Sequence, residues 1–477
     1  MTFVTNPSTA TARQRTGQAG RRRRAALVAV LLILLAACTP GTPTGPEPPA
    51  TARAQPPGAP RTLAPADWPT YHHDNARTGV GAVAPLAAPA VLSQAWVARL
   101  DGAVYGQPLV LGTTVIAATE NDTVYGLAAA DGHVLWSRHL GEPQPLSDLP
   151  CGDIDPLGIT STAAYDPDTG QVFVTAELRG GTHLLAGLDP ADGTVTLSRP
   201  VEPPRGDHGA AQQRAALTVF GGFVYVAYGG LYGDCGDYVG SVVAAPTTGL
   251  GPLRSYAVPT SREGGIWAPG GAVVSANSLL YAVGNGESTS DYDHTDSVLA
   301  LSPELALTDS FSPTEWVQDN QHDLDLGSLG PTVVGRYVYA DGKRGVGYVL
   351  DGTRLGGVGG QLSQQQVCAA YGGSSVDGGS MYLPCRDGTR RVDLDAAGRL
   401  TVRWRAPVPA AGSPVVGGGA VWTVDLAAGT LYALDPGTGA VRASVSVGPV
   451  PHFASPTLSG TRAYVGTMSG VTAVGGA

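Results

Sequence analysis

The sequence predicts an all-β protein: an eight-bladed β-propeller of four-stranded antiparallel blades, whose ring is closed by an N-terminal strand. From residue 67 onward, short runs rich in Val and Tyr alternate with turn dipeptides such as Asp131-Gly132, as expected of strands joined by tight turns. These runs recur in units that resemble one another. No stretch sustains an apolar period of 3.6 residues, so helix is expected to be nearly absent.

The first 37 residues are typical of an export signal. Four consecutive arginines (21–24) precede an uncharged apolar run at 25–37, which is shorter than the ~20 residues that a membrane-spanning helix needs. The run ends in LAAC (35–38), which resembles the bacterial lipobox and implies that Cys38 becomes a lipid-modified N-terminus. An ordinary signal peptide followed by an incidental cysteine is the alternative, and it also implies export.

Residues 38–66 are predicted to form a disordered stalk. Residues 39–66 hold nine prolines and no aromatic residue, so they cannot bury enough apolar surface to offset the entropy of ordering. Polyproline-like stiffness would let the stalk reach up to ~3 Å per residue. The predicted domains are therefore a lipoprotein signal peptide (1–37), a stalk (38–66) and a propeller (67–477).

The charge of the chain limits its partners. Removing the signal peptide with its six arginines changes the net charge from −10 to about −16, and a field of that sign repels phosphate backbones and anionic headgroups. Nucleic acid is therefore not an expected partner. Attachment to a membrane must come from acyl chains rather than from a basic patch.

The repeat is visible in two long segments. GQPLVLGTTVIAATENDTVYGLAAADGHVLWSRHLG (106–141) aligns with GSPVVGGGAVWTVDLAAGTLYALDPGTGAVRASVSVG (412–448), and residues 454–476 repeat the first two-thirds of both. Each unit contains four strand patterns, as a propeller blade does. Eight first strands are entered at Gly106, Thr160, Ala215, Trp267, Ser328, Gly372, Gly412 and Ala454.

The two ends of the array are complementary. The last unit lacks a fourth strand, whereas VLSQAWVARL (91–100) is a fourth-type strand with no unit before it. We therefore predict that this strand completes the last blade, with Trp96 placed as Trp136 is in the first. A closed ring also leaves few free sheet edges. Two separate domains are the alternative, which leaves residues 91–100 unexplained.

The segments VYGLAAADGHVLW, LYALDPGTGAVRAS and DWPTYHHDNARTG (67–79) carry a family resemblance. They are similar to the pyrroloquinoline-quinone-like (quinoprotein alcohol dehydrogenase-like) β-propeller repeat superfamily over nearly the whole mature chain. That superfamily includes calcium- and quinone-dependent dehydrogenases and a barrel-assembly lipoprotein that is a pure scaffold. The resemblance therefore implies the fold and leaves the function open.

Signatures of catalysis are missing from the sequence. The family dehydrogenases commonly carry a vicinal Cys-Cys pair, a calcium held by Glu, Asn and Asp, and a catalytic Asp. Here the cysteines after Cys38 are far apart, and no Cys-x-x-Cys-His, Gly-x-Ser-x-Gly or His-Glu-x-x-His motif occurs. No catalytic residue is assigned and no cofactor is expected; pyrroloquinoline quinone (PQQ) and Ca²⁺ belong to the alternative, dehydrogenase interpretation.

The four remaining cysteines suit an exported protein that is held by disulfides. They allow three pairings, and we favour Cys151–Cys235 with Cys368–Cys385, because the second pair lies within one blade and the first joins insertions of neighbouring blades. Each bridge would contribute about 3–5 kcal/mol by restricting the unfolded chain. A reactive thiol is the lesser alternative.

A ligand is expected at the mouth of the central channel, where the first strands begin and converge. The candidate residues form a polar ring that suits a small polar or planar ligand; they are Gln107, Thr160, Arg214, Trp267, Asp325, Ser413 and His452. A water-filled channel lined by polar groups is the alternative. In the loop before the fifth unit, Asp319, Asp323 and Asp325 are candidate calcium ligands, with solvated turn residues as the alternative.

We therefore expect a monomeric, non-catalytic propeller that is lipid-anchored at the outer face of a bacterial membrane. It would act as a binding or assembly scaffold for other envelope proteins or for a small polar ligand, because rigid blades with variable loops form a broad platform. A PQQ- and calcium-dependent oxidoreductase is the alternative function.

Overall fold

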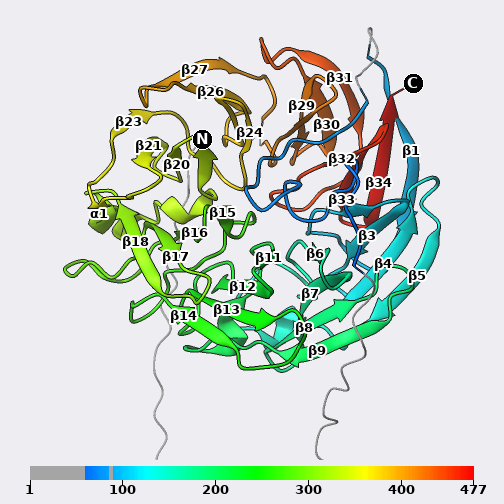
Figure 1. Cartoon of the computed structure of the whole chain (residues 1–477), viewed down its shortest axis with the longest axis horizontal. Coiled ribbons are helices and arrows are strands. Elements are labelled where there is room, and N and C mark those ends of the chain that lie inside the picture. Colours follow the sequence, from blue (N-terminus) through cyan, green and yellow to red (C-terminus); the bar gives the residue numbers. More distant parts are fainter. Residues whose placement is uncertain (1–59, 85–89, 410, 477) are drawn as a thin grey trace, which may run out of the picture. The chain divides into compact units, whose positions relative to one another are not determined.

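The computed structural model describes residues 60–84, 90–409 and 411–476. They form eight β-sheets, and successive sheets follow one another around a centre (Figure 1). The predicted signal peptide, Cys38 and most of the predicted stalk lie outside the described residues. We number the sheets as blades 1–8 in the order in which their first strands occur.

Blades 1 to 4 are built from residues 109–312, with one short strand added from residues 357–358. Their strands are β2 (Leu109–Leu111), β3 (Thr114–Ala118), β4 (Thr123–Ala128) and β5 (Val134–His139) in blade 1; β6 (Ala164–Asp166), β7 (Gln171–Leu178), β8 (Thr182–Leu188) and β9 (Val195–Pro200) in blade 2; β10 (Ala211–Gln212), β11 (Thr218–Phe220), β12 (Phe223–Gly230), β13 (Ser241–Pro246) and β14 (Arg254–Ala257) in blade 3; β15 (Val273–Ser275), β16 (Ser278–Val283), β17 (Ser297–Leu301), β18 (Leu307–Ser312) and β22 (Gly357–Val358) in blade 4.

Blades 5 to 8 follow, and blade 8 takes its last strand from the N-terminal side. Their strands are β19 (Thr332–Val334), β20 (Tyr337–Ala340), β21 (Val346–Asp351) and β23 (Ser363–Gln366) in blade 5; β24 (Ser375–Asp377), β25 (Ser380–Leu383), β26 (Arg390–Leu394) and β27 (Leu400–Arg405) in blade 6; β28 (Val415–Gly417), β29 (Ala420–Asp425), β30 (Thr430–Leu434) and β31 (Val441–Ser446) in blade 7; β32 (Thr457–Ser459), β33 (Arg462–Thr467), β34 (Gly470–Gly476) and β1 (Leu92–Arg99) in blade 8.

The predicted eight-bladed fold is confirmed, and each predicted entry position lies a few residues before a first strand. Two blades carry a fifth strand that the repeat pattern did not indicate. In blade 3, β12 is longer than β11, and its free end pairs with β10. In blade 4, β22 adds in parallel to the outer strand β18.

Helix is scarce, as predicted. Within the described ranges there is one α-helix, α1 (Trp316–His322), and there are three short 3₁₀ turns, η1 (Leu146–Asp148), η2 (His208–Ala210) and η3 (Leu326–Ser328). No helix in this part of the chain is both long and apolar enough to span a membrane.

Ring closure by the N-terminal strand is also confirmed. Strand β1 pairs antiparallel with β34, with Trp96 opposite Ala473. The Trp96 indole Nε1 donates to the Ala129 carbonyl of blade 1 at 3.1 Å, just as Trp136 donates from blade 1 to Pro190 of blade 2. The fourth strand of one blade is thereby attached to the outer turn of the next.

Apolar side chains fill the space between every pair of neighbouring blades. Separate clusters of buried residues join blades 1 and 2, 2 and 3, 3 and 4, 4 and 5, 5 and 6, and 6 and 7, and one further cluster joins blades 7, 8 and 1. The core is therefore a ring of blade-to-blade contacts, which leaves the central channel to be filled by other residues.

Both predicted disulfides are present. Cys151–Cys235 links loops of blades 2 and 3 at a sequence separation of 84, and Cys368–Cys385 lies next to blades 5 and 6 at a sequence separation of 17. Restricting the unfolded chain in this way stabilises by about 3 kcal/mol for the shorter loop and somewhat more for the longer one. Paired cysteines are consistent with a protein that is exported to an oxidising compartment.

Candidate functional site

The central channel is crossed by residues 67–84, which we call the plug segment; it forms part of the blue trace near the centre of the ring (Figure 1). It contains the motif DWPTYHHDNARTG and almost no regular strand. Its backbone bonds to first strands or their turns around the ring, at Val110, Tyr165, Val274, Val376, Val416 and Gly460. These partners lie along or beyond the first strands, so the plug segment lies deeper in the channel than the strand-entry positions.

The described fold begins slightly before the predicted boundary at residue 67. Arg61 donates its backbone N–H to Pro167 and pairs with the Asp67 carboxylate at 3.2 Å. Leu63 packs against the cluster between blades 1 and 2. Residues 60–66 are therefore docked on the propeller rather than part of a disordered stalk, because Arg61 and Leu63 form contacts with it.

Gln107, a predicted channel residue, holds the plug segment in place. Its side-chain oxygen accepts from the backbone N–H of His72 at 2.8 Å and from the Trp68 indole at 3.3 Å. Its amide nitrogen donates to Ser455 Oγ and to the Pro456 carbonyl. With every polar atom engaged, Gln107 has a structural role and is not free to bind a ligand.

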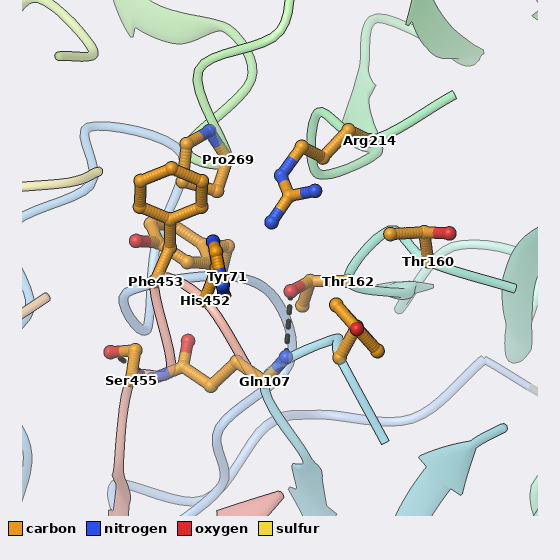
Figure 2. A pocket seen from close by; sticks show the side chains of 10 residues that line it. Tyr71, Gln107, Thr160, Thr162, Arg214, Pro269, His452, Phe453 and Ser455 are labelled. Carbon is orange, nitrogen blue, oxygen red and sulfur yellow. Dashed lines mark hydrogen bonds between the residues drawn. The ribbon is translucent and has the colours of Figure 1, made fainter. Parts of the chain in front are cut away.

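A small cavity lies at the channel mouth, the end of the channel where the first strands begin (Figure 2). The volume open to the centre of a water molecule is about 20 Å³, which holds about one or two waters. It is lined by Tyr71, Tyr105, Gln107, Thr160, Thr162, Arg214, Pro269, His452, Phe453 and Ser455. Four predicted ring residues meet here: Gln107, Thr160, Arg214 and His452.

The floor of the cavity is rigid and uncharged. Tyr71 stacks on His72 with ring centroids 4.1 Å apart, and the His72 nitrogens contact the Ser374 carbonyl and Ser455 Oγ. Burial lowers the pKa of His72 to about 3, so the imidazole is neutral at physiological pH. His72 therefore adds no charge to the cavity, and the arginine that lines it is Arg214.

Arg214 is the cation of the cavity. Its guanidinium carbon lies 4.7 Å from the centre of the Phe453 ring and 5.9 Å from that of Tyr105, and Figure 2 shows it extending toward the space opposite Thr162. Burial lowers its pKa from the ordinary value, yet arginine stays charged at physiological pH. The stacked rings attract and orient the cation.

Behind Thr160, buried carboxylates connect blades 1 and 2. Thr160 Oγ1 donates to Glu120 Oε2 at 3.1 Å, and the same oxygen accepts from the Gly158 N–H at 2.8 Å. Burial raises the pKa of Glu120 to about 8. Burial, followed by the charge of Glu120, raises the pKa of Asp122 to about 9, and neither Asp122 oxygen has a hydrogen-bond partner among the described residues.

These raised pKa values predict a fold that weakens as pH rises. Between the ordinary carboxyl pKa near 4 and the folded values, the folded state retains protons that the unfolded state releases, so stability falls across that range. Asp122→Asn removes one such proton, and we expect it to reduce the loss between pH 5.5 and pH 8.5 by at least about 1 kcal/mol. Urea unfolding at both pH values measures this difference.

Asp131→Asn is the matched control, because Asp131 is an exposed turn residue of the same blade with a lowered pKa. It should leave the slope between these two pH values unchanged. An unchanged slope in Asp122→Asn would show that Asp122 is ionised in the fold.

The other half of the predicted ring lies outside this cavity. Trp267 packs against Phe453 with ring centroids 6.0 Å apart, and Lys343 Nζ lies 5.9 Å from the centre of a Trp267 ring. Asp325 is 2% exposed. Ser413 is fully buried and accepts from the Gly373 N–H, so it supports the channel wall instead of facing a ligand.

The predicted calcium ligands are paired with cations instead. Lys343 Nζ lies 2.5 Å from both Asp323 and Asp325, and Arg344 Nε lies 2.6 Å from Asp319. Nowhere in the described ranges do three His, Cys, Asp or Glu side chains form a group that could hold a metal. The prediction that these residues bind a metal cation is therefore not met. The alternative, that they are solvated turn residues, does not hold for Asp319 and Asp325, which are each 2% exposed.

Sequence reasoning missed the aromatic part of the cavity. Tyr71 belongs to a segment without strand character, and Tyr105 precedes the first entry position. Phe453 follows the predicted His452 directly, but its backbone φ of 63° turns the ring inward. The available signal was an aromatic residue directly before an entry position, as Tyr105 stands before Gly106 and Phe453 before Ala454.

Comparisons with known proteins agree with this architecture. A family model described as outer membrane protein assembly factor BamB matches residues 92–291. Among solved structures, the chain is similar to quinohemoprotein alcohol dehydrogenase from Comamonas testosteroni, with a TM-score of 0.65 and 18% identity over 86% of this chain and 80% of that chain. The matched residues cover less than half of the chain, and the structural likeness shows the propeller fold of these proteins.

Two further solved structures share the fold. The chain is similar to BamB from Moraxella catarrhalis, with a TM-score of 0.54 and 17% identity over 80% of this chain and 97% of that chain. It is also similar to a europium-containing methanol dehydrogenase, with a TM-score of 0.62 and 16% identity over 86% and 91%. No curated protein sequence matches the chain. Identities this low establish the fold alone, which does not decide between scaffold and dehydrogenase.

The residues of this propeller do not fit a quinone and its metal at the channel mouth. Pockets that enclose ligands of that size measure ~300–1,000 Å³, whereas this cavity offers about 20 Å³. Tyr71 and Phe453 occupy the space between the entry positions (Figure 2). The candidate calcium ligands are neutralised by Lys343 and Arg344.

Proposed function

We propose that the protein is a non-catalytic binding or assembly module of the cell envelope. The observation that carries this proposal is the filled channel: the place where a propeller of this superfamily would enclose a cofactor is occupied by the plug segment and Phe453. Blades that are joined on all sides by apolar clusters provide a rigid platform, and the exposed loops are free to contact partners.

The dehydrogenase alternative is tested by adding PQQ and Ca²⁺ to the purified protein. We expect no stoichiometric spectrum of bound quinone and no dye reduction with primary alcohols, because the cavity is too small for the ring system. A spectrum of bound quinone together with dye reduction would refute the scaffold proposal. The matched control is the Phe453→Gly variant, whose cavity is larger, mixed with free PQQ in the same way.

The binding role itself is tested in cells with a photo-crosslinking amino acid. We expect a discrete crosslinked species when it replaces His452, which is exposed at the channel mouth, and none when it replaces Arg99, which is exposed on the outer strand β1. Equal crosslinking from both positions would argue against a partner at the channel mouth.

Location at the membrane rests on the sequence. The disulfides and the superfamily are consistent with an exported envelope protein, and the lipobox-like residues before Cys38 support lipid anchoring at the outer face of a bacterial membrane. We expect Cys38→Ser to shift the protein from the membrane fraction to the soluble fraction, because stable anchoring needs the acyl chains. Cys38→Ser protein that remains with the membrane would contradict this role of Cys38.

A further inference from the structure

Arg214 is only partly exposed, yet it lacks the hydrogen-bond partners that an arginine in such a place normally has. It forms no hydrogen bond or ion pair with any described residue, and its Nε is buried without an acceptor. Arg77, the other arginine of the channel, donates to backbone or hydroxyl oxygens with all three nitrogens. A buried N–H without an acceptor is costly, and the two terminal nitrogens of the guanidinium supply further donors on the cavity side. These donors point to an acceptor that is not part of this chain.

Neighbouring carboxylates do not supply that acceptor. Glu120 and Asp153 act on Arg214 through space, but neither forms an ion pair with it within 4 Å. Glu120 is held by Gly158 and Thr160, and burial raises its pKa to about 8, so it is largely neutral at physiological pH. Asp153 is exposed, which weakens its interaction with Arg214 through solvent screening.

The cavity around the guanidinium is preformed. Phe453 covers one side of Arg214, and it does so with a left-handed backbone φ of 63°, a conformation that costs a non-glycine residue roughly 1 kcal/mol or more. Thr162 Oγ1 accepts from the Gln107 N–H at 2.8 Å. The hydroxyl hydrogen of Thr162 remains available to donate toward the same space, opposite Arg214 (Figure 2).

We propose that Arg214 and Thr162 bind a carboxylate whose apolar or aromatic body lies toward the channel mouth. A cavity of about 20 Å³ suits one anionic head group in place of one or two waters and excludes a quinone. Tyr105 continues the cavity into an apolar wall formed by Ile154, Leu157 and Leu231 beside the Cys151–Cys235 bridge. This inference rests on the proposed binding role and names the ligand class that the site takes.

The test compares benzoate with its neutral analogue benzamide on the purified protein, by saturation-transfer NMR and calorimetry. We expect benzoate to bind with a Kd of about 1–10 mM, typical of a few kcal/mol, and benzamide at least about tenfold more weakly, because the charged hydrogen bonds are lost. Arg214→Gln should weaken benzoate binding by about tenfold or more. Arg99→Gln, an exposed arginine on β1, should leave it unchanged.

Benzoate binding that Arg214→Gln leaves unchanged, or no difference between benzoate and benzamide, would overturn the proposal. If Arg214→Gln does not fold, the comparison of the two probes on the native protein decides alone. A short peptide ending in Phe, as free acid and as amide, separates the sources of the carboxylate: tighter binding of the peptide acid than of benzoate indicates a chain terminus, and the reverse indicates a small organic acid. Binding of quinone together with dye reduction would refute the proposed scaffold function. If benzoate does not bind and quinone does not bind either, only the carboxylate site is refuted.

Discussion

Trp96→Ala is expected to lower the free energy of unfolding by about 3–5 kcal/mol, the usual cost of removing a tryptophan from a core. Trp96 is 9% exposed, packs with Tyr464 at a ring-centroid distance of 5.8 Å and donates to the Ala129 carbonyl of blade 1. It belongs to β1, the strand that the N-terminal side contributes to blade 8. The substitution therefore weakens the junction where the two ends of the array meet.

Glycine at position 132 is part of the same junction. A β-carbon at Gly132, which has a φ of 78°, would lie 2.5 Å from the Trp96 ring. The indole thus packs directly against the outer turn of blade 1, a contact that any side chain at position 132 would disturb. Urea unfolding followed by near-UV circular dichroism measures the loss.

Trp136→Ala is the matched control for Trp96→Ala. Trp136 holds the equivalent place in blade 1 and donates to Pro190 of blade 2, but blades 1 and 2 are consecutive in the chain, and its side chain is only half-buried. We expect a smaller loss for Trp136→Ala, about 1–2 kcal/mol. If Trp96→Ala cost no more than Trp136→Ala, closure by β1 would not be a stabilising feature of the ring.

The ring could be predicted because its evidence is local and repeated. Short Val- and Tyr-rich strands and glycine-containing turns recur along the array, and an unmatched strand at 91–100 corresponds to a missing one after residue 476. The disulfide pairing could be predicted from the same assignment of residues to blades, which places the paired cysteines within one blade or in neighbouring blades. Short-range patterns of this kind are set by turn chemistry and alternation, which a single sequence displays.

The plug segment could not be predicted, because its structure consists of long-range contacts. It has no alternating pattern, and Arg77 finds its acceptors at Leu217 and Thr218, about 140 positions away. The acidic loop was misread for the same reason: Asp323 and Asp325 meet Lys343, which arrives on the following blade. Residue type and spacing indicated oxygen ligands but not the cation that neutralises them.

Arg77→Met is expected to lower the free energy of unfolding by about 3–5 kcal/mol, because several buried acceptors lose their donor at once. Arg77 is 5% exposed and donates to the Ala272, Tyr71 and Leu217 carbonyls as well as to two threonine hydroxyls. It therefore ties the plug segment to the first strands of blades 3 and 4. No carboxylate forms an ion pair with it within the described residues, so its contribution comes from hydrogen bonds to neutral oxygens.

Two variants separate loss of these hydrogen bonds from loss of charge or volume. Arg77→Lys keeps the charge but has a single side-chain nitrogen, which cannot reach both blades, so we expect an intermediate loss of stability. Arg99→Met, on the exposed face of β1, should change the free energy of unfolding by less than about 0.5 kcal/mol. Hydrogen exchange then distinguishes how the loss is distributed. If the plug segment and the ring form one cooperative unit, Arg77→Met lowers the protection of backbone amides in blades 3 and 4 together with that of Trp68. Faster exchange confined to residues 67–84 would instead mean that the plug segment can leave the channel while the ring stays folded.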